Sequence, residues 1–168
     1  MRARQLAQEF PTVELDDDAL DAARTMAESG RPGLVVLDGH GKAYTVLPGS
    51  QVLRFAVPVY VQSDPHLARV FDEKTADELF GKLAGRTVRD LLPDSRDHHA
   101  ELPVVDPDAT SIEVAAVLAR MHSPIAVVSD GDSILGVITV SRLLRALLPG
   151  TPDPTLPADG SSSEPELR

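Results

Sequence analysis

The chain has 168 residues, of which 42% are hydrophobic and 25% charged, a composition that suits one compact domain or two small ones. Its formal net charge of −10 argues against a protein whose main task is to grip nucleic acid, because that task requires a dense cationic surface. The absence of cysteine excludes disulfides, thiolate nucleophiles and cysteine-based zinc sites. No segment is apolar enough for a signal peptide or a membrane span, so we expect a cytoplasmic protein without direct membrane insertion.

The first part of the chain predicts alternating strands and helices. An amphipathic helix begins after Asp18, whose side chain can accept hydrogen bonds from the free N–H groups of the first turn. The extended run after this helix ends in Asp38-Gly39, which is typical of a hairpin turn. The elements predicted here are a lead-in helix at residues 4–6, strands at 11–13, 34–37 and about 43–47, and helices after Asp18 and Ser50.

Residues from about 54 to 85 have no counterpart elsewhere in the chain. Asp64-Pro65 predicts a helix start, since proline is favoured at the first helical position. Apolar residues at helical spacing then continue as far as Gly85. We therefore expect an inserted pair of helices that packs on the domain.

The second half repeats the first at an offset of 92 residues, without a gap. Pro11 and Val13 recur as Pro103 and Val105, and the residues around the first hairpin recur as Pro124, Val127, Val128, Asp130 and Gly131. Two copies are too few for a solenoid, so they indicate two pseudo-equivalent β-α-β-β-α halves around one core. A ligand site in one half therefore has a potential counterpart in the other. The predicted divisions are a first repeat at 1–53, a helical insertion at 54–86, a second repeat at 87–148 and a disordered tail at 149–168.

The end of the second repeat resembles a known family. Residues 135–144 are similar to the Gly-h-h-Thr-x-x-Asp-h-h ending (h, apolar) of the cystathionine-β-synthase (CBS) domain, and residues 87–92 are similar to its lead-in segment. The resemblance covers about residues 3–53 and 87–148. It implies an α/β fold of the α+β type, in which two CBS repeats pack as one stand-alone Bateman module, interrupted here by the helical insertion. Such modules are usually dimers joined through their helices, so a homodimer is expected.

The resemblance also implies a function. CBS clefts bind adenosine-containing ligands such as AMP, ADP, ATP or S-adenosylmethionine, and the modules commonly regulate an enzyme or a transporter without catalytic activity of their own. We therefore expect no catalytic residues, no resident metal and no obligatory cofactor.

The expected ligand site lies in the second repeat, where phosphate would meet the Thr139 hydroxyl and the helix that begins at Ser141. Arg142 stands where the family has the Asp that accepts hydrogen bonds from ribose, and arginine cannot accept them. It could hold a second phosphate or a partner's carboxylate, or it could be a solvated arginine of the first turn. In the gapless register Leu47 and Ser50 occupy the corresponding positions of the first repeat, which disfavours a phosphate site there. The expected ligand-binding residues are Val104, Val105, Ile125, Ala126, Thr139, Ser141 and Arg142.

Two other functions are consistent with the sequence. One is a ligand-independent interaction or dimerisation module, whose nucleotide sites are degenerate and whose function resides in the insertion and the dimer face. The other is a small hydrolase that uses His98 or His99; a polar loop is the simpler interpretation of this pair, and no third histidine nearby completes a metal site.

Overall fold

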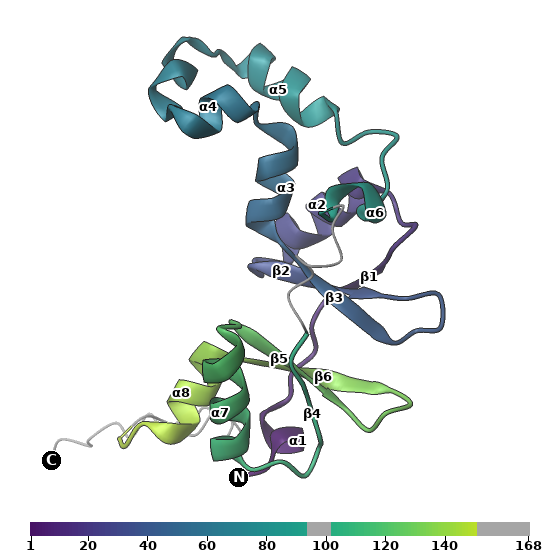
Figure 1. Ribbon diagram of the computed structural model, residues 1–168, viewed down its shortest axis with the longest axis vertical. Coiled ribbons are helices and arrows are strands. Elements are labelled where there is room, and N and C mark those ends of the chain that lie inside the picture. The colour runs from purple at the N-terminus through teal and green to yellow at the C-terminus, as the bar shows by residue number, and fades with distance from the viewer. Residues whose placement is uncertain (94–101, 151–168) are drawn as a thin grey trace, which may run out of the picture.

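The computed structural model describes residues 1–93 and 102–150, and in this part of the chain two three-stranded sheets face each other (Figure 1). In each sheet the first two strands run parallel and the last two form an antiparallel hairpin. The first sheet contains β1 (Thr12–Glu14), β2 (Gly33–Leu37) and β3 (Ala43–Pro48), in that order. The second contains β4 (Val104–Val105), β5 (Ile125–Ser129) and β6 (Ile134–Thr139). The predicted α/β fold with two β-α-β-β-α halves is confirmed.

Helices cover the outer face of each sheet, so the order of layers is helix, sheet, sheet, helix (Figure 1). The helices of the repeats are α1 (Ala3–Leu6), α2 (Ala19–Ser29), α3 (Gly49–Ala56), α6 (Val88–Leu91), α7 (Ser111–Met121) and α8 (Val140–Leu147). In the central strands, successive side chains point alternately to the helices on one face of the sheet and to the other sheet on the opposite face. Val35 and Val127 pack between the sheets, whereas Val36 and Val128 point to the helices.

Side-chain caps define where the two long helices begin, as the sequence predicts. The Asp18 carboxylate accepts from the backbone N–H groups of Leu20 and Asp21. Thr110 and Glu113 form the expected reciprocal capping box at the start of α7. The Thr110 N–H donates to the Glu113 carboxylate, and this hydrogen bond is the main cause of the lowered pKa of Glu113.

Removal of the α7 cap should cause a measurable loss of stability. We expect Thr110→Ala to lower the free energy of unfolding by about 1 kcal/mol, because a backbone donor of the first turn loses its partner. Urea unfolding of Thr110→Ala beside Thr110→Ser measures this, and the serine variant, which keeps the hydroxyl, should stay close to the wild type. Equal losses in the two variants would show that the hydroxyl does not cap the helix.

The two hairpins differ by one residue, and this corrects the register expected at the end of each repeat. Five residues separate β2 from β3, whereas four separate β5 from β6. In each turn an aspartate, Asp38 or Asp130, accepts backbone hydrogen bonds that lower its pKa, above all from Lys42 and from Ser133. The offset between halves is therefore 92 residues before the turn and 91 after it. Pro48 and Gln51, not Leu47 and Ser50, correspond to Thr139 and Arg142.

The short lead-in helices cross between the halves. α1 packs in the cluster of the second sheet with Val114 and Ile138, and α6 packs in the cluster of the first sheet with Leu34. Equivalent backbone hydrogen bonds hold them, from Ala3 N to Ala109 O and from Val88 N to Asp17 O. Each sheet thus packs against the lead-in helix of the other repeat. The predicted boundaries of the repeats at residues 53 and 86 concern the sequence and stay a prediction.

The insertion is helical, but it is not a simple pair of helices. It contains α4 (Val59–Ser63), a 3₁₀ helix η1 (Pro65–Val70) and α5 (Glu73–Gly81). Asp64 caps η1 as expected, and Asp72 caps α5 by accepting a hydrogen bond from the Thr75 N–H. Phe80 and Leu83 pack on the core of the first sheet.

Some predictions concern residues outside the described part of the chain. The His98-His99 pair lies there, as does the predicted tail from residue 151 onward. Among the residues described, no helix has the length and apolar character needed to cross a membrane.

Candidate functional site

Two cavities lie at the same end of the two sheets, and each combines a strand-to-helix junction of one half with a helix-to-strand turn of the other. The β3 cavity, of about 610 Å³, joins the β3–α3 junction to the α7–β5 turn. The β6 cavity, of about 450 Å³, joins the β6–α8 junction to the α2–β2 turn. Both volumes suit a small-molecule ligand. The pseudo-symmetry of the repeat therefore produces a pair of corresponding cavities.

The β6–α8 junction presents hydroxyl groups to its cavity. Thr139 caps α8, since its hydroxyl oxygen accepts from the Arg142 N–H at 3.3 Å. The Thr139 and Ser141 hydroxyl oxygens are 3.1 Å apart and share a hydrogen bond. The Val140 N–H donates to Pro124 O at 3.0 Å and so fastens the start of the helix to the start of β5. The junction offers hydroxyl groups beside the positive end of a helix dipole, a suitable environment for an anion.

Arg142 is held in place and is not a freely solvated side chain. Its guanidinium Nε donates to Leu6 O at 2.7 Å, and the residue is half-buried. The terminal nitrogens of this guanidinium have no partner among the described residues, and the residue lines the β6 cavity. The contact with the end of α1 thus fixes the orientation of this side chain at the edge of the cavity.

The turn between α2 and β2 brings the first repeat into the β6 cavity. Gly30 ends α2 in the left-handed conformation, with φ of 62°, and the chain then enters β2 through Arg31 and Pro32. All three residues line the cavity, as does Arg145 one helical turn beyond Ser141. The Arg31 guanidinium also lies over the Phe10 ring, 5.6 Å from its centroid.

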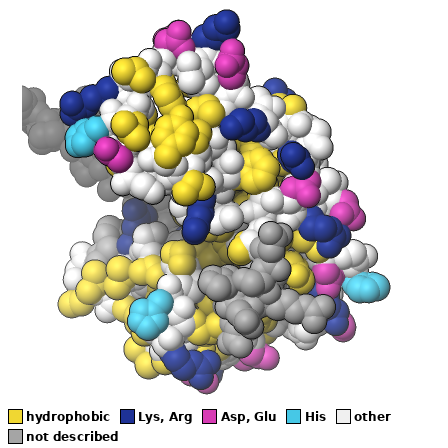
Figure 2. All heavy atoms as spheres, turned by 45° about the horizontal axis from the view of Figure 1, so that its top comes forward, with side chains coloured by type: hydrophobic (Ala, Val, Ile, Leu, Met, Phe, Trp, Pro, Cys, Tyr) yellow, Lys and Arg dark blue, Asp and Glu magenta, His cyan; other side chains and the backbone are white. Residues whose placement is uncertain are grey.

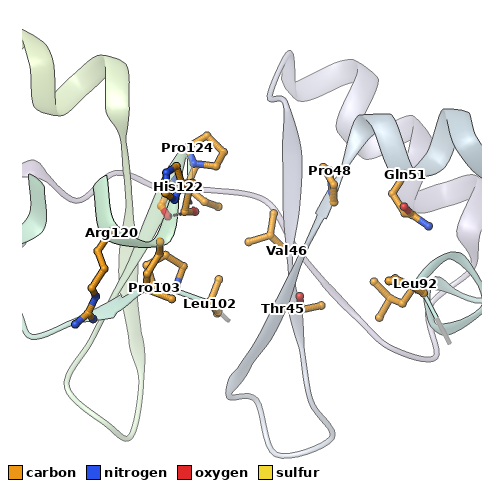
Figure 3. Close-up of a pocket in the computed structure, with 14 residues that line it drawn as sticks. Thr45, Val46, Pro48, Gln51, Leu92, Leu102, Pro103, Arg120, His122 and Pro124 are labelled. Carbon is orange, nitrogen blue, oxygen red and sulfur yellow. Dashed lines mark hydrogen bonds between the residues drawn. The ribbon is translucent and has the colours of Figure 1, made fainter. Parts of the chain in front are cut away.

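The β3 cavity is chemically different. At the β3–α3 junction Pro48 replaces the capping threonine, so this junction has no side-chain cap, and Gln51 replaces Arg142. In Figure 3, Val46 from the first half and Pro124 from the second extend into the space between the two sheets. Thr45 also lines this cavity, and its side chain is buried. The β3 cavity is therefore largely apolar and lacks the hydroxyl pair of the β6 junction.

Four of the seven expected ligand residues come together. Ile125, Thr139, Ser141 and Arg142 all line the β6 cavity. Val105 and Ala126 instead lie in the core beneath the helices of the second half, and Val104 is exposed beside the hairpin turns. The pleat explains this placement, because neighbours on a strand point to opposite faces.

The sequence prediction missed Arg31 and Arg145. The repeat contained a signal for the turn that holds Arg31, because this residue corresponds to Ser123, two residues before the expected ligand residue Ile125. Arg145 lies four residues after Ser141 and so on the same side of the helix. Within the described residues, no group of three His, Cys, Asp or Glu side chains could hold a metal ion.

Comparisons with known proteins agree with this architecture. Residues 88–149 match the model of the CBS domain. A CBS domain-containing protein of unknown function from Kribbella flavida is 51% identical, with 87% of this chain and 97% of that chain covered and a TM-score of 0.77. A search of curated proteins finds no match.

Two more distant structures share the fold. The CBS domain of a membrane protein from Sphaerobacter thermophilus is 23% identical, with 88% of each chain covered and a TM-score of 0.66. The CBSX2 protein, solved in complex with AMP, is 19% identical, with 86% of this chain and 94% of that chain covered and a TM-score of 0.59. With half of its residues identical to the Kribbella protein over most of both chains, this chain belongs to the CBS domain family and contains a tandem pair of CBS repeats.

Proposed function

We propose that the chain is a non-catalytic, cytoplasmic regulatory module that binds an adenine-containing nucleotide in the β6 cavity. The observation that carries the proposal is the β6–α8 junction, where Thr139, Ser141 and Arg142 line one cavity. The hydroxyl groups and the helix start suit a phosphate, and Ile125 with Pro124 supplies an apolar wall for the base. The AMP complex of the CBSX2 protein shows that the shared fold can hold such a ligand.

The position of the cavity suggests how binding would be transmitted. Its lining comes from both repeats, with Arg31 from the first and Arg142 from the second. A ligand that contacts both residues favours the arrangement of the halves in which both contacts form. Any partner enzyme or transporter that distinguishes these arrangements then responds to the nucleotide, since coupling requires only differential affinity for two states.

Thermal melting with AMP, ADP, ATP and S-adenosylmethionine, each with and without Mg²⁺, tests the nucleotide site. We expect one of these ligands to raise the melting temperature, because a ligand that binds only the folded state stabilises it by about 2.7 kcal/mol at a hundredfold excess over its Kd. Thr139→Val should abolish the shift, whereas Thr139→Ser, which keeps the hydroxyl, should retain it.

Because Thr139 also caps α8, each variant is compared with its own ligand-free melting temperature. Thr110→Val is the matched control, since it removes the corresponding cap of α7, away from both cavities. The control should keep the full ligand shift. A shift that survives in Thr139→Val, or no shift with any ligand in the wild type, would contradict the proposal.

A second candidate function is a ligand-independent interaction module, and the insertion favours it. α4 and η1 expose Val59, Tyr60, Leu67 and Val70, the first and last at 77% and 86% of their full surface. Figure 2 shows hydrophobic side chains gathered on the upper lobe, which holds the insertion. α8 and the residue that follows it also expose Leu144, Leu147 and Leu148, which suits the homodimer expected from the family resemblance. The melting experiment separates the two functions, because this candidate predicts no shift with any nucleotide.

A further inference from the structure

The β6 cavity concentrates positive charge in an acidic protein. Its lining residues include three arginines, Arg31, Arg142 and Arg145, and no Asp or Glu. The whole chain has 26 acidic and 16 basic residues. The β3 cavity, its counterpart in the other half, has a single arginine, Arg120. The cluster of arginines is thus specific to the β6 cavity and is not repeated in the corresponding cavity of the other half.

Within the described residues, none of the three arginines forms a salt bridge with a carboxylate. Arg142 uses Nε to hold Leu6 O, and Arg31 packs against Phe10, so both side chains are oriented by neutral partners. Arg145 is exposed on the next turn of α8. Three cations at one cavity repel each other, and this repulsion would be relieved by an anion that reaches all of them.

A single phosphate does not match this arrangement. The start of α8 with Arg142 can accommodate one phosphate group, which leaves Arg31 on the opposite wall and Arg145 beyond the first turn. Each guanidinium can donate two parallel hydrogen bonds to phosphate oxygens. A chain of phosphates provides a separate anionic group for each cation. The nucleoside contributes less, because Arg142 replaces the Asp that would accept hydrogen bonds from ribose.

We propose that the β6 cavity is a polyphosphate clamp, in which Arg31 of the first repeat and Arg142 and Arg145 of the second hold a chain of two or more phosphates between the halves. This inference rests on the proposed nucleotide site and specifies its ligand class, a linear polyphosphate. The number of phosphates, more than the nucleoside, then determines affinity. Both a nucleoside triphosphate and inorganic triphosphate contain this chemistry.

Isothermal titration calorimetry of the full chain with AMP, ADP, ATP and inorganic triphosphate, without Mg²⁺, measures this dependence. We expect affinity to rise from AMP to ATP by at least about tenfold, and inorganic triphosphate to displace ATP. Arg31→Gln and Arg145→Gln should each weaken ATP binding by about tenfold and AMP binding far less. Arg120→Gln is the matched control, since it removes the same charge from the β3 cavity, and it should leave ATP affinity unchanged.

The outcomes separate the clamp from the nucleotide site itself. Equal affinities for AMP and ATP, without displacement by triphosphate, would overturn the clamp and leave the adenine nucleotide site standing. Equal affinities for ATP and inorganic triphosphate would support the clamp and contradict specificity for adenine. If AMP binds but ATP and triphosphate do not, the clamp alone fails, whereas no binding of AMP, ADP, ATP or triphosphate contradicts both proposals. Because Arg145 is exposed, its variant stays informative even if Arg31→Gln perturbs the packing on Phe10.

Discussion

Gly136→Ala should lower the free energy of unfolding by about 2 kcal/mol or more. Gly136 lies in β6 with φ of 150°, a conformation that residues with a side chain rarely adopt. A Cβ atom there would lie 2.8 Å from the backbone oxygen of Gln8. This backbone cannot simply move away, because Gln8 exchanges two hydrogen bonds with Val137, of 3.0 and 2.9 Å. Alanine therefore forces the N-terminal segment off β6.

Gly39→Ala is the matched control for this variant. Gly39 lies in the first hairpin turn, where an added Cβ would meet nothing within 4 Å. Urea unfolding of the two variants should give a large loss for Gly136→Ala and little change for Gly39→Ala. The N-terminal segment also positions Arg142 through Leu6 O, so nucleotide binding should weaken with stability in Gly136→Ala. Equal stabilities of the two variants would show that the crossing over β6 is not a tight constraint.

The second large effect is expected at Ile125, which connects the core to both cavities. Its side chain is 2% exposed, lies in the cluster between the two sheets and borders both the β3 and the β6 cavity. Ile125→Ala removes three carbon atoms where the sheets meet, and the cavity left behind adds to the lost burial. We expect a loss of about 3 kcal/mol in the free energy of unfolding.

Ile125→Val tests whether this cost scales with the volume removed. The valine variant should lose about 1 kcal/mol, and the denaturant slope should stay that of the wild type in both variants. A loss below about 1 kcal/mol for Ile125→Ala would mean that the sheets close over the gap. The cluster between the sheets would then contribute much less than its burial indicates.

The sequence predicted the features that depend on local chemistry. Asp18 and Thr110 cap helices as expected, because an N-cap needs only a short polar side chain next to the first turn. The strands around Val35 and Val127 follow from apolar runs that end in turn residues. The duplication indicated that a site in one half would have a potential counterpart in the other, and the two halves do form two corresponding cavities.

Features that depend on contacts between distant segments could not be predicted in this way. The exchange of α1 and α6 between the sheets leaves no local pattern in the sequence. Gly136 is required only because Gln8 crosses β6; its counterpart after the one-residue shift is Thr45, a buried residue with a side chain. Arg31 is more than 100 residues away from Thr139 in sequence. The repeat could point to its turn, but only the structure shows that Arg31 lines the same cavity as Thr139.

The most direct test of the nucleotide site is the change in backbone amide NMR signals of the full chain during titration with ATP. The proposal predicts that the largest changes occur around the β6 cavity, at Gly30, Arg31, Ser141 and Arg142. Gln51 and His122 border only the β3 cavity, so the largest changes at these residues would place the ligand at the β3–α3 junction and contradict the account. Signals that stay unchanged at high concentrations of ATP would also contradict it.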